Sequence, residues 1–302
     1  MKKGLMITAA LMAGASIEAA ELAEVVLVTG EDADKVFLIA ASERLIEYTR
    51  VKGGLNRHRM LRAEIDAIYF YEPPLFAEAL ELYEGRDYAG AREKFAECRE
   101  AYKAIDELPG NFSTLAGFYM LECCRKMRDL GTLKELLDDF QSGPLTREVH
   151  KNQEKVYILW DAVRTEGWSR LVGLADEFLE DKEWTGEQLA QIYFCKGQAL
   201  EGLDRPIEAL NSFNGAFTAD RAASEGITRD AALACLRIYK NHEEVQLAIK
   251  LWGTEDEDPE SPGYLMLQEA VSLCELWKKA LGGGQPLPNE YAVFLKYKAK
   301  EI

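Results

Sequence analysis

The sequence contains no apolar run long enough to form a membrane-spanning helix, and it has very little histidine. Its uncharged N-terminal run, from Gly4 to Ala15, falls short of the roughly 18 residues that such a helix requires. Its histidines, three in 302 residues, lie in separate segments and form no HExxH-type ligand pair. A GxSxG nucleophile motif and a phosphate-binding glycine loop are also missing. The sequence therefore indicates a protein that is not an enzyme and needs no cofactor.

Basic residues are outnumbered by acidic ones, and no long basic stripe stands out. Lys+Arg 36 against Asp+Glu 52 gives a formal net charge of −16, with a pI near 4.8. This balance makes nucleic acid and anionic membrane surfaces poor partners. The chain is long enough to bury one large core or two, so we expect it to fold without metal or disulfides.

The N-terminus has the pattern of an export signal. Lys2 and Lys3 precede the uncharged run, and Ala13-Gly14-Ala15 is an acceptable cleavage site. We therefore predict a signal peptide over residues 1–20 and a mature protein that is periplasmic or secreted. A buried amphipathic helix is the alternative, but the run has no polar face.

Residues 21–72 show the alternation of short β-strands. Apolar and β-branched residues recur with period two, and Gly30, Ser42 and the Gly53-Gly54 pair interrupt them. The predicted strands centre on residues 25–28, 36–39, 45–48 and 65–71. So many short strands favour a small curled all-β barrel, whose pattern resembles an SH3 or Sm-like domain. Such a domain would either bind a ligand or merely cover the first helices.

Pro73-Pro74 ends this region, and helical periodicity follows up to the C-terminus. The organising element is a predicted helical hairpin at residues 187–221, turned at the segment from Gly202 to Pro206. Its apolar residues recur at three- and four-residue steps on both sides of the turn: Leu189, Ile192, Tyr193, Gly197, Leu200, Ile207, Leu210, Phe213 and Phe217.

This hairpin resembles a tetratricopeptide repeat. Tyr193 and Gly197 stand where the first helix of that repeat packs, and the small-large-small seam of its second helix is formed by Ala209, Phe213 and Ala216. Lys196 and Arg221 depart from the family pattern, in which Leu and Pro are usual. The resemblance implies a mainly α protein, a solenoid of α-helical hairpins of the TPR type, preceded by the small β domain.

A second copy of the seam supports a repeat array. Ala91, Phe95 and Cys98 have the same spacing in a hairpin turned at Gly85 to Tyr88. Further hairpins are predicted over 112–141, 146–179 and 227–252, so the repeats would occupy residues 73–254. An acidic linker at 255–263 and capping helices over 264–302 complete the predicted organisation, with Asn289 as the cap of the last helix.

The six cysteines all fall within helical patterns, where a small apolar side chain is accepted. We therefore expect packing residues. A bridge from Cys98 to Cys123 or Cys124 is the alternative that an exported protein invites.

The predicted function is that of an exported, non-enzymatic scaffold that binds a segment of a protein partner. If the seam faces the adjoining helix, other residues of the first helices face an inner groove. These are Gln191, Phe194, Cys195, Gln198 and Glu201, with Leu233 and Arg237 on the next hairpin. The alternative for Phe194 is a place in the core.

The fold resemblance also suggests a setting. Bacterial envelope proteins of this build commonly act in envelope assembly or in energy-coupling complexes. The alternative function is binding of glycan or peptidoglycan through the β domain or through Trp160, Trp168 and Trp184.

Overall fold

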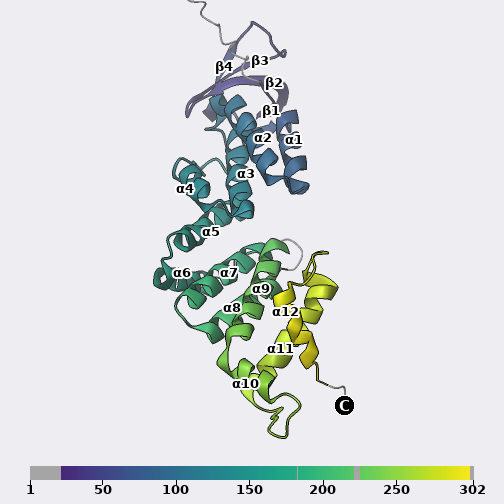
Figure 1. The fold of residues 1–302 in the computed structure, drawn as a ribbon. Coiled ribbons are helices and arrows are strands. Elements are labelled where there is room, and N and C mark those ends of the chain that lie inside the picture. Colours follow the sequence, from purple (N-terminus) through teal and green to yellow (C-terminus); the bar gives the residue numbers. More distant parts are fainter. Residues whose placement is uncertain (1–21, 182, 221–224, 300–302) are drawn as a thin grey trace, which may run out of the picture.

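The structure is a computed structural model that describes residues 22–181, 183–220 and 225–299. The predicted signal peptide lies outside the described residues. Figure 1 shows an elongated molecule, with a β-sheet at one end and helices that follow one another towards the C-terminus. The chain is thus mainly helical with an N-terminal antiparallel sheet, as the sequence predicted at this level.

The sheet has five antiparallel strands in the order β4-β3-β2-β1-β5, so β1 to β4 form a meander and β5 returns to pair with β1. Its strands are β1 (Ala23–Thr29), β2 (Asp32–Ala41), β3 (Leu45–Thr49), β4 (His58–Leu61) and β5 (Ala67–Phe70). Alternate side chains such as Val25, Leu27 and Val36 are buried, because one face of the sheet packs on the first helices. Strand β4 was not predicted, since two polar residues followed by two apolar ones give no alternation.

Ten helices form five consecutive antiparallel pairs within the described residues. The pairs are α1 (Pro74–Glu84) with α2 (Tyr88–Ala101), α3 (Phe112–Met127) with α4 (Leu130–Asp138), α5 (Glu148–Arg164) with α6 (Trp168–Glu180), α7 (Gly186–Gly202) with α8 (Pro206–Ala219), and α9 (Glu225–Asn241) with α10 (Glu243–Leu251). Every predicted hairpin is present as a helical pair, and the two turns placed from the sequence, at residues 85–88 and 202–206, lie where they were predicted.

Four of the five pairs turn through the same backbone geometry. One or two residues after the end of each of these first helices comes a non-glycine with positive φ, namely Arg86, Arg128, Glu166 and Asp204. The amide N–H of the following residue donates to a carbonyl five residues back, as from Asp87 N to Leu82 O at 2.9 Å. This bond satisfies a carbonyl that the helix end leaves open. The same turn therefore recurs in four of the five helical pairs.

The predicted seam of the central hairpin is fully buried. Ala209, Phe213 and Ala216 each have 0% exposure. A Cβ on Gly197 would lie 2.6 Å from the ring of Phe213, so glycine allows α7 to approach α8 this closely. The seam therefore packs as its spacing predicted.

Two apolar cores share helix α3. One joins the sheet to α1–α3, and the other extends from α3 to the C-terminus; Leu115 and Tyr119 pack against both. The elongated shape in Figure 1 therefore has a continuous interior, with α3 as the link.

Both predicted C-terminal segments are helical, but neither is α-helical throughout. Helix α11 (Pro262–Leu276) continues into a π-turn (Trp277–Leu281), and α12 (Asn289–Ala292) leads into a 3-10 turn (Val293–Tyr297). The N-cap of α12 is Pro288, because Asn289 already belongs to the helix. None of the helices described has both the length and the apolar character needed to cross a bilayer.

Candidate functional site

The first helices of successive pairs are neighbours: α1 contacts α3, α3 is bonded to α5 through Glu122 and Tyr157, and α7 contacts both α5 and α9. We call the side of the molecule that α1, α3, α5, α7 and α9 form the first-helix face. A cavity of about 410 Å³ opens on it, where α5, α7 and α9 meet the end of α3. It is lined by Arg128, Leu130, Trp160, Val163, Phe194, Gln198, Phe213, Asp230, Leu233, Ala234 and Arg237. Four of the seven predicted site residues, Phe194, Gln198, Leu233 and Arg237, thus line one cavity, which we call the central cavity.

Arg128 lies over the aromatic wall of the central cavity. Its guanidinium carbon is 4.4 Å from the ring centre of Trp160 and 5.1 Å from that of Phe194. It also pairs with Asp230 across the cavity at 2.9 Å. A planar cation that is stacked on rings and paired at one edge keeps donors for a ligand carboxylate or carbonyl.

Gln198 brings an unsatisfied acceptor to the same cavity. Its Oε1 atom is buried and has no hydrogen-bond partner among the described residues. A buried polar atom without a partner destabilises the folded state by about 1–3 kcal/mol. An N–H donor of a bound segment would remove this penalty, so the cavity is suited to a peptide backbone.

The other predicted site residues are placed differently. Gln191 is fully buried and accepts hydrogen bonds from Gln153 and Trp160 at 2.9 and 3.0 Å. Cys195 is also fully buried, and burial raises the pKa of its thiol to about 12. Glu201 pairs with Arg237 at 2.7 Å at the edge of the cavity. Gln191 and Cys195 therefore shape the cavity from behind and do not line it.

Phe194 combines the two roles that the sequence left open. Only 5% of its surface is exposed, and its ring packs against Trp160 and Phe213. It is a core residue whose accessible edge belongs to the cavity wall.

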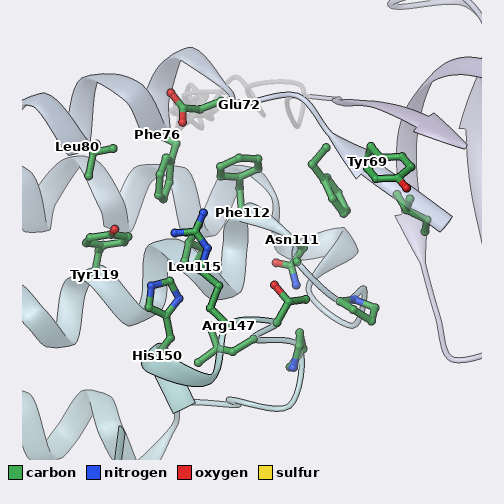
Figure 2. Close-up of a pocket in the computed structure, with 17 residues that line it drawn as sticks. Tyr69, Glu72, Phe76, Leu80, Asn111, Phe112, Leu115, Tyr119, Arg147 and His150 are labelled. Carbon is green, nitrogen blue, oxygen red and sulfur yellow. The ribbon is translucent and has the colours of Figure 1, made fainter. Parts of the chain in front are cut away.

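A second cavity of about 550 Å³, shown in Figure 2, lies where β5 meets α1, α3 and α5. Its wall includes the rings of Phe76, Phe112 and Tyr119, with the Phe76 and Phe112 centroids 4.8 Å apart. We call it the aromatic cavity. This cavity was not predicted from the sequence. Its aromatic residues lie at helical spacing on first helices, and such spacing predicts helix packing equally well.

Two basic side chains project into the aromatic cavity from the start of α5. Figure 2 shows Arg147 and His150 pointing towards the rings of Phe112 and Tyr119. The His150 ring stacks on Phe118 at 4.4 Å, and burial together with the charge of Arg147 lowers the pKa of His150. With His150 neutral, the charged groups in the lining of this cavity are the cation of Arg147 and the carboxylate of Glu72.

A buried ionic network holds α3, α5 and α7 together. Glu122 accepts bonds from Arg125 at 2.8 Å and from the hydroxyl of Tyr157 at 2.6 Å. Arg125 also reaches Glu187 on α7 at 3.1 Å. Burial alone would raise the pKa of Glu122, but the charge of Arg125 and its hydrogen bonds outweigh burial and lower it. The network fixes the spacing of three helices of the first-helix face.

The tryptophans proposed for glycan binding serve in packing. Trp160 is 1% exposed, and Trp184 donates its indole N–H to the carbonyl of Phe178 at 2.6 Å. Trp168 packs so closely on Gly202 that an added Cβ would lie 2.6 Å from its Nε1. Trp160 is thus a core residue, whereas Trp168 and Trp184 are half-buried.

Groups of three or more metal-ligating side chains do not occur in the described part of the chain. Burial raises the pKa of the Cys123, Cys235 and Cys274 thiols to about 12. Such thiols are poor nucleophiles at neutral pH.

No protein-family model, curated protein or solved structure that was compared with the chain matches it. Function must therefore be argued from the geometry itself.

Proposed function

We propose that the chain is a non-enzymatic scaffold that binds an extended or helical segment of a protein partner along its first-helix face. The observation that carries this proposal is the central cavity, which gathers aromatic, amide and paired charged groups from four separate helices. Its acceptor Gln198 and its stacked Arg128 suit the amide and carboxylate groups of a peptide.

The fold assignment that accompanies this proposal is a TPR-like solenoid. Five successive helical pairs with a recurring turn, and a seam of small and large residues, support it. For the N-terminal domain we propose an SH3-like or Sm-like barrel. Its support is a five-stranded antiparallel sheet in which the first and last strands pair.

Export to the periplasm or the medium is part of the same proposal, and the sequence pattern of residues 1–20 supports it. Mass spectrometry of the protein from its native cell should give an N-terminus between Ser16 and Glu21. An intact Met1 in a cytoplasmic fraction would contradict export and leave the scaffold proposal standing.

Peptide selection tests the binding proposal. Phage-displayed peptides would be selected on the parent protein and then measured against Gln198→Ala combined with Arg237→Ala. We expect selected peptides to lose affinity by about tenfold or more, since a buried polar contact and a cavity-edge charge are removed. The melting temperature should change little, because Arg237 is exposed and Gln198 makes no internal bond through its Oε1.

Arg205→Ala is the matched control. It breaks a comparable exposed ion pair, with Glu208, at the α7–α8 turn and outside the cavity lining. Peptides that bind the cavity variant as tightly as the parent would refute the proposed site.

A further inference from the structure

The acidic chain carries one concentrated basic segment, which its overall charge conceals. Between Tyr48 and Ala63 there are five Arg or Lys residues and no Asp or Glu. They are Arg50, Lys52, Arg57, Arg59 and Arg62, spread over the end of β3, the following loop, β4 and the 3-10 turn. We call residues 50–62 the basic loop. The acidic charge balance of the whole chain makes anionic surfaces poor partners, but the basic loop differs from that balance locally.

Two large apolar side chains stand at the tip of the basic loop. Leu55 is 96% exposed and Val51 is 68% exposed. These are the highest exposures among the large hydrophobic residues described. Exposed apolar side chains surrounded by cations are typical of a surface that contacts a membrane or another molecule.

The tip has a defined backbone. Gly54 N donates to Val51 O at 2.8 Å, and the hydroxyl of Thr49 donates to the same oxygen at 2.9 Å. Gly53 has φ +70°, and a Cβ on Gly54 would lie 2.9 Å from that oxygen. The turn therefore requires both glycines, and it presents Val51 and Leu55 at its two ends.

The charges of the basic loop are only partly neutralised. Arg50 pairs with Asp34 at 3.3 Å. Arg57 and Arg59 share the single carboxylate of Glu47, at 3.5 and 3.8 Å. Lys52 forms no ion pair within the described part of the chain. A net positive charge therefore remains beside the apolar tip.

The rest of the acidic molecule does little to cancel this charge at a distance. Figure 1 shows the sheet with β3 and β4 at one end of the elongated molecule, far from the C-terminal helices. The Debye length at physiological salt is about 8 Å, so most of the acidic charge is screened at the basic loop.

We propose that the basic loop is a peripheral contact site for the surface of an anionic phospholipid bilayer. The arginines and Lys52 meet lipid phosphates, while Leu55 and Val51 enter the boundary between headgroups and acyl chains. A bilayer accounts for both features of the loop. Nucleic acid or another polyanion uses the cations alone and leaves both apolar side chains in water.

Vesicle co-sedimentation with the full chain tests this site. The probes are vesicles of pure phosphatidylcholine and vesicles of equal parts phosphatidylcholine and phosphatidylglycerol. We expect salt-sensitive binding to the anionic vesicles only. Two double variants separate the contributions: Val51→Ser with Leu55→Ser, and Arg57→Gln with Arg59→Gln. Each should weaken binding by about fivefold or more, because both apolar insertion and charge are needed.

A matched control tests whether the loss of any two exposed apolar side chains weakens vesicle binding. Leu247→Ser with Leu265→Ser removes two leucines that are each 54% exposed at the opposite end of the chain, and it should bind as the parent does. All proteins share the same N-terminus, so any contribution of Lys2 and Lys3 is common to them.

Three outcomes would overturn the proposal. The first is no preference for anionic vesicles, and the second is parental binding by both loop variants. The third is loss of vesicle binding in the arginine variant with full retention in the Val51 and Leu55 variant. That last pattern, joined by binding to heparin or DNA, would identify a general polyanion site.

Discussion

At the scale of single residues, one glycine sets how closely the central helices approach. Gly197→Leu would drive new atoms into Phe213, since a Cβ alone lies 2.6 Å from its ring. We expect the free energy of unfolding to fall by about 1–3 kcal/mol or more, measured by urea denaturation. Gly173→Ala in α6 is the control, because nothing lies within 4 Å of its added Cβ. Equal melting of parent and Gly197→Leu would disprove the close crossing.

The buried Glu122 predicts a reversal of pH dependence. In the parent its pKa is lowered from 4.5, so its stabilising contribution is present above that pH and is lost as the pH falls. Arg125→Met leaves the carboxylate buried without its main partner, and burial then raises its pKa. Stability of the variant should be lost as pH rises, by about 3–5 kcal/mol relative to the parent near neutrality.

Urea denaturation at about pH 5.5 and about pH 7.5 checks this reversal. The deficit of Arg125→Met should be smaller at the lower pH. A deficit that is the same at both values would mean that Glu122 does not carry the effect.

At the scale of elements, the recurring turn stores strain in four hairpins. Glu166 has φ +54°, a conformation that costs a non-glycine residue about 1–2 kcal/mol. Glu166→Gly should therefore raise the free energy of unfolding, by about 0.5–1 kcal/mol after the entropy of glycine in the unfolded chain is included. Glu166→Ala, which keeps the strain, is the control. A lower stability of the glycine variant in urea denaturation would contradict this assignment.

At the scale of the whole molecule, two apolar cores joined at α3 predict regional responses to mutation. Phe213→Ala should cost about 3–5 kcal/mol, because a fully buried ring is removed. Its effect on amide hydrogen exchange should concentrate in α7 to α9 and leave β1 and β2 nearly unchanged, since hairpins contact mainly their neighbours. Phe76→Ala, in the other core, should give the opposite distribution. Uniform acceleration in both variants would mean a single cooperative unit.

The hairpins were predictable because local patterns determine them. Apolar spacing at three and four residues, together with turn residues such as Asp87 and Pro206, fixes both the helices and their ends. Strand β4 was missed because its residues show no alternation and its pairing partner lies on β3. Such pairing depends on tertiary contacts.

The central cavity was predicted only in part, because local spacing indicates a helix face but tertiary contacts decide which of its residues are accessible. Residue spacing on α7 indicated which side chains share one face of the helix. It could not distinguish those that line the cavity from those that are buried beneath it. Gln191 was expected in the groove, yet its amide is fully buried against α5. The aromatic cavity was not predicted because its lining comes from β5 and three helices, which are brought together only by the tertiary fold.

The recurring turn leaves the side chain at its positive-φ position free to vary. Its closure depends on backbone bonds, so the side chain at the positive-φ position is spared from holding the hairpin together. In the second hairpin that position is Arg128, which covers the central cavity. Four of the five helical pairs thus have one position whose side chain is not needed to close the turn. New recognition chemistry can be introduced there by substitution, with the architecture left as it is.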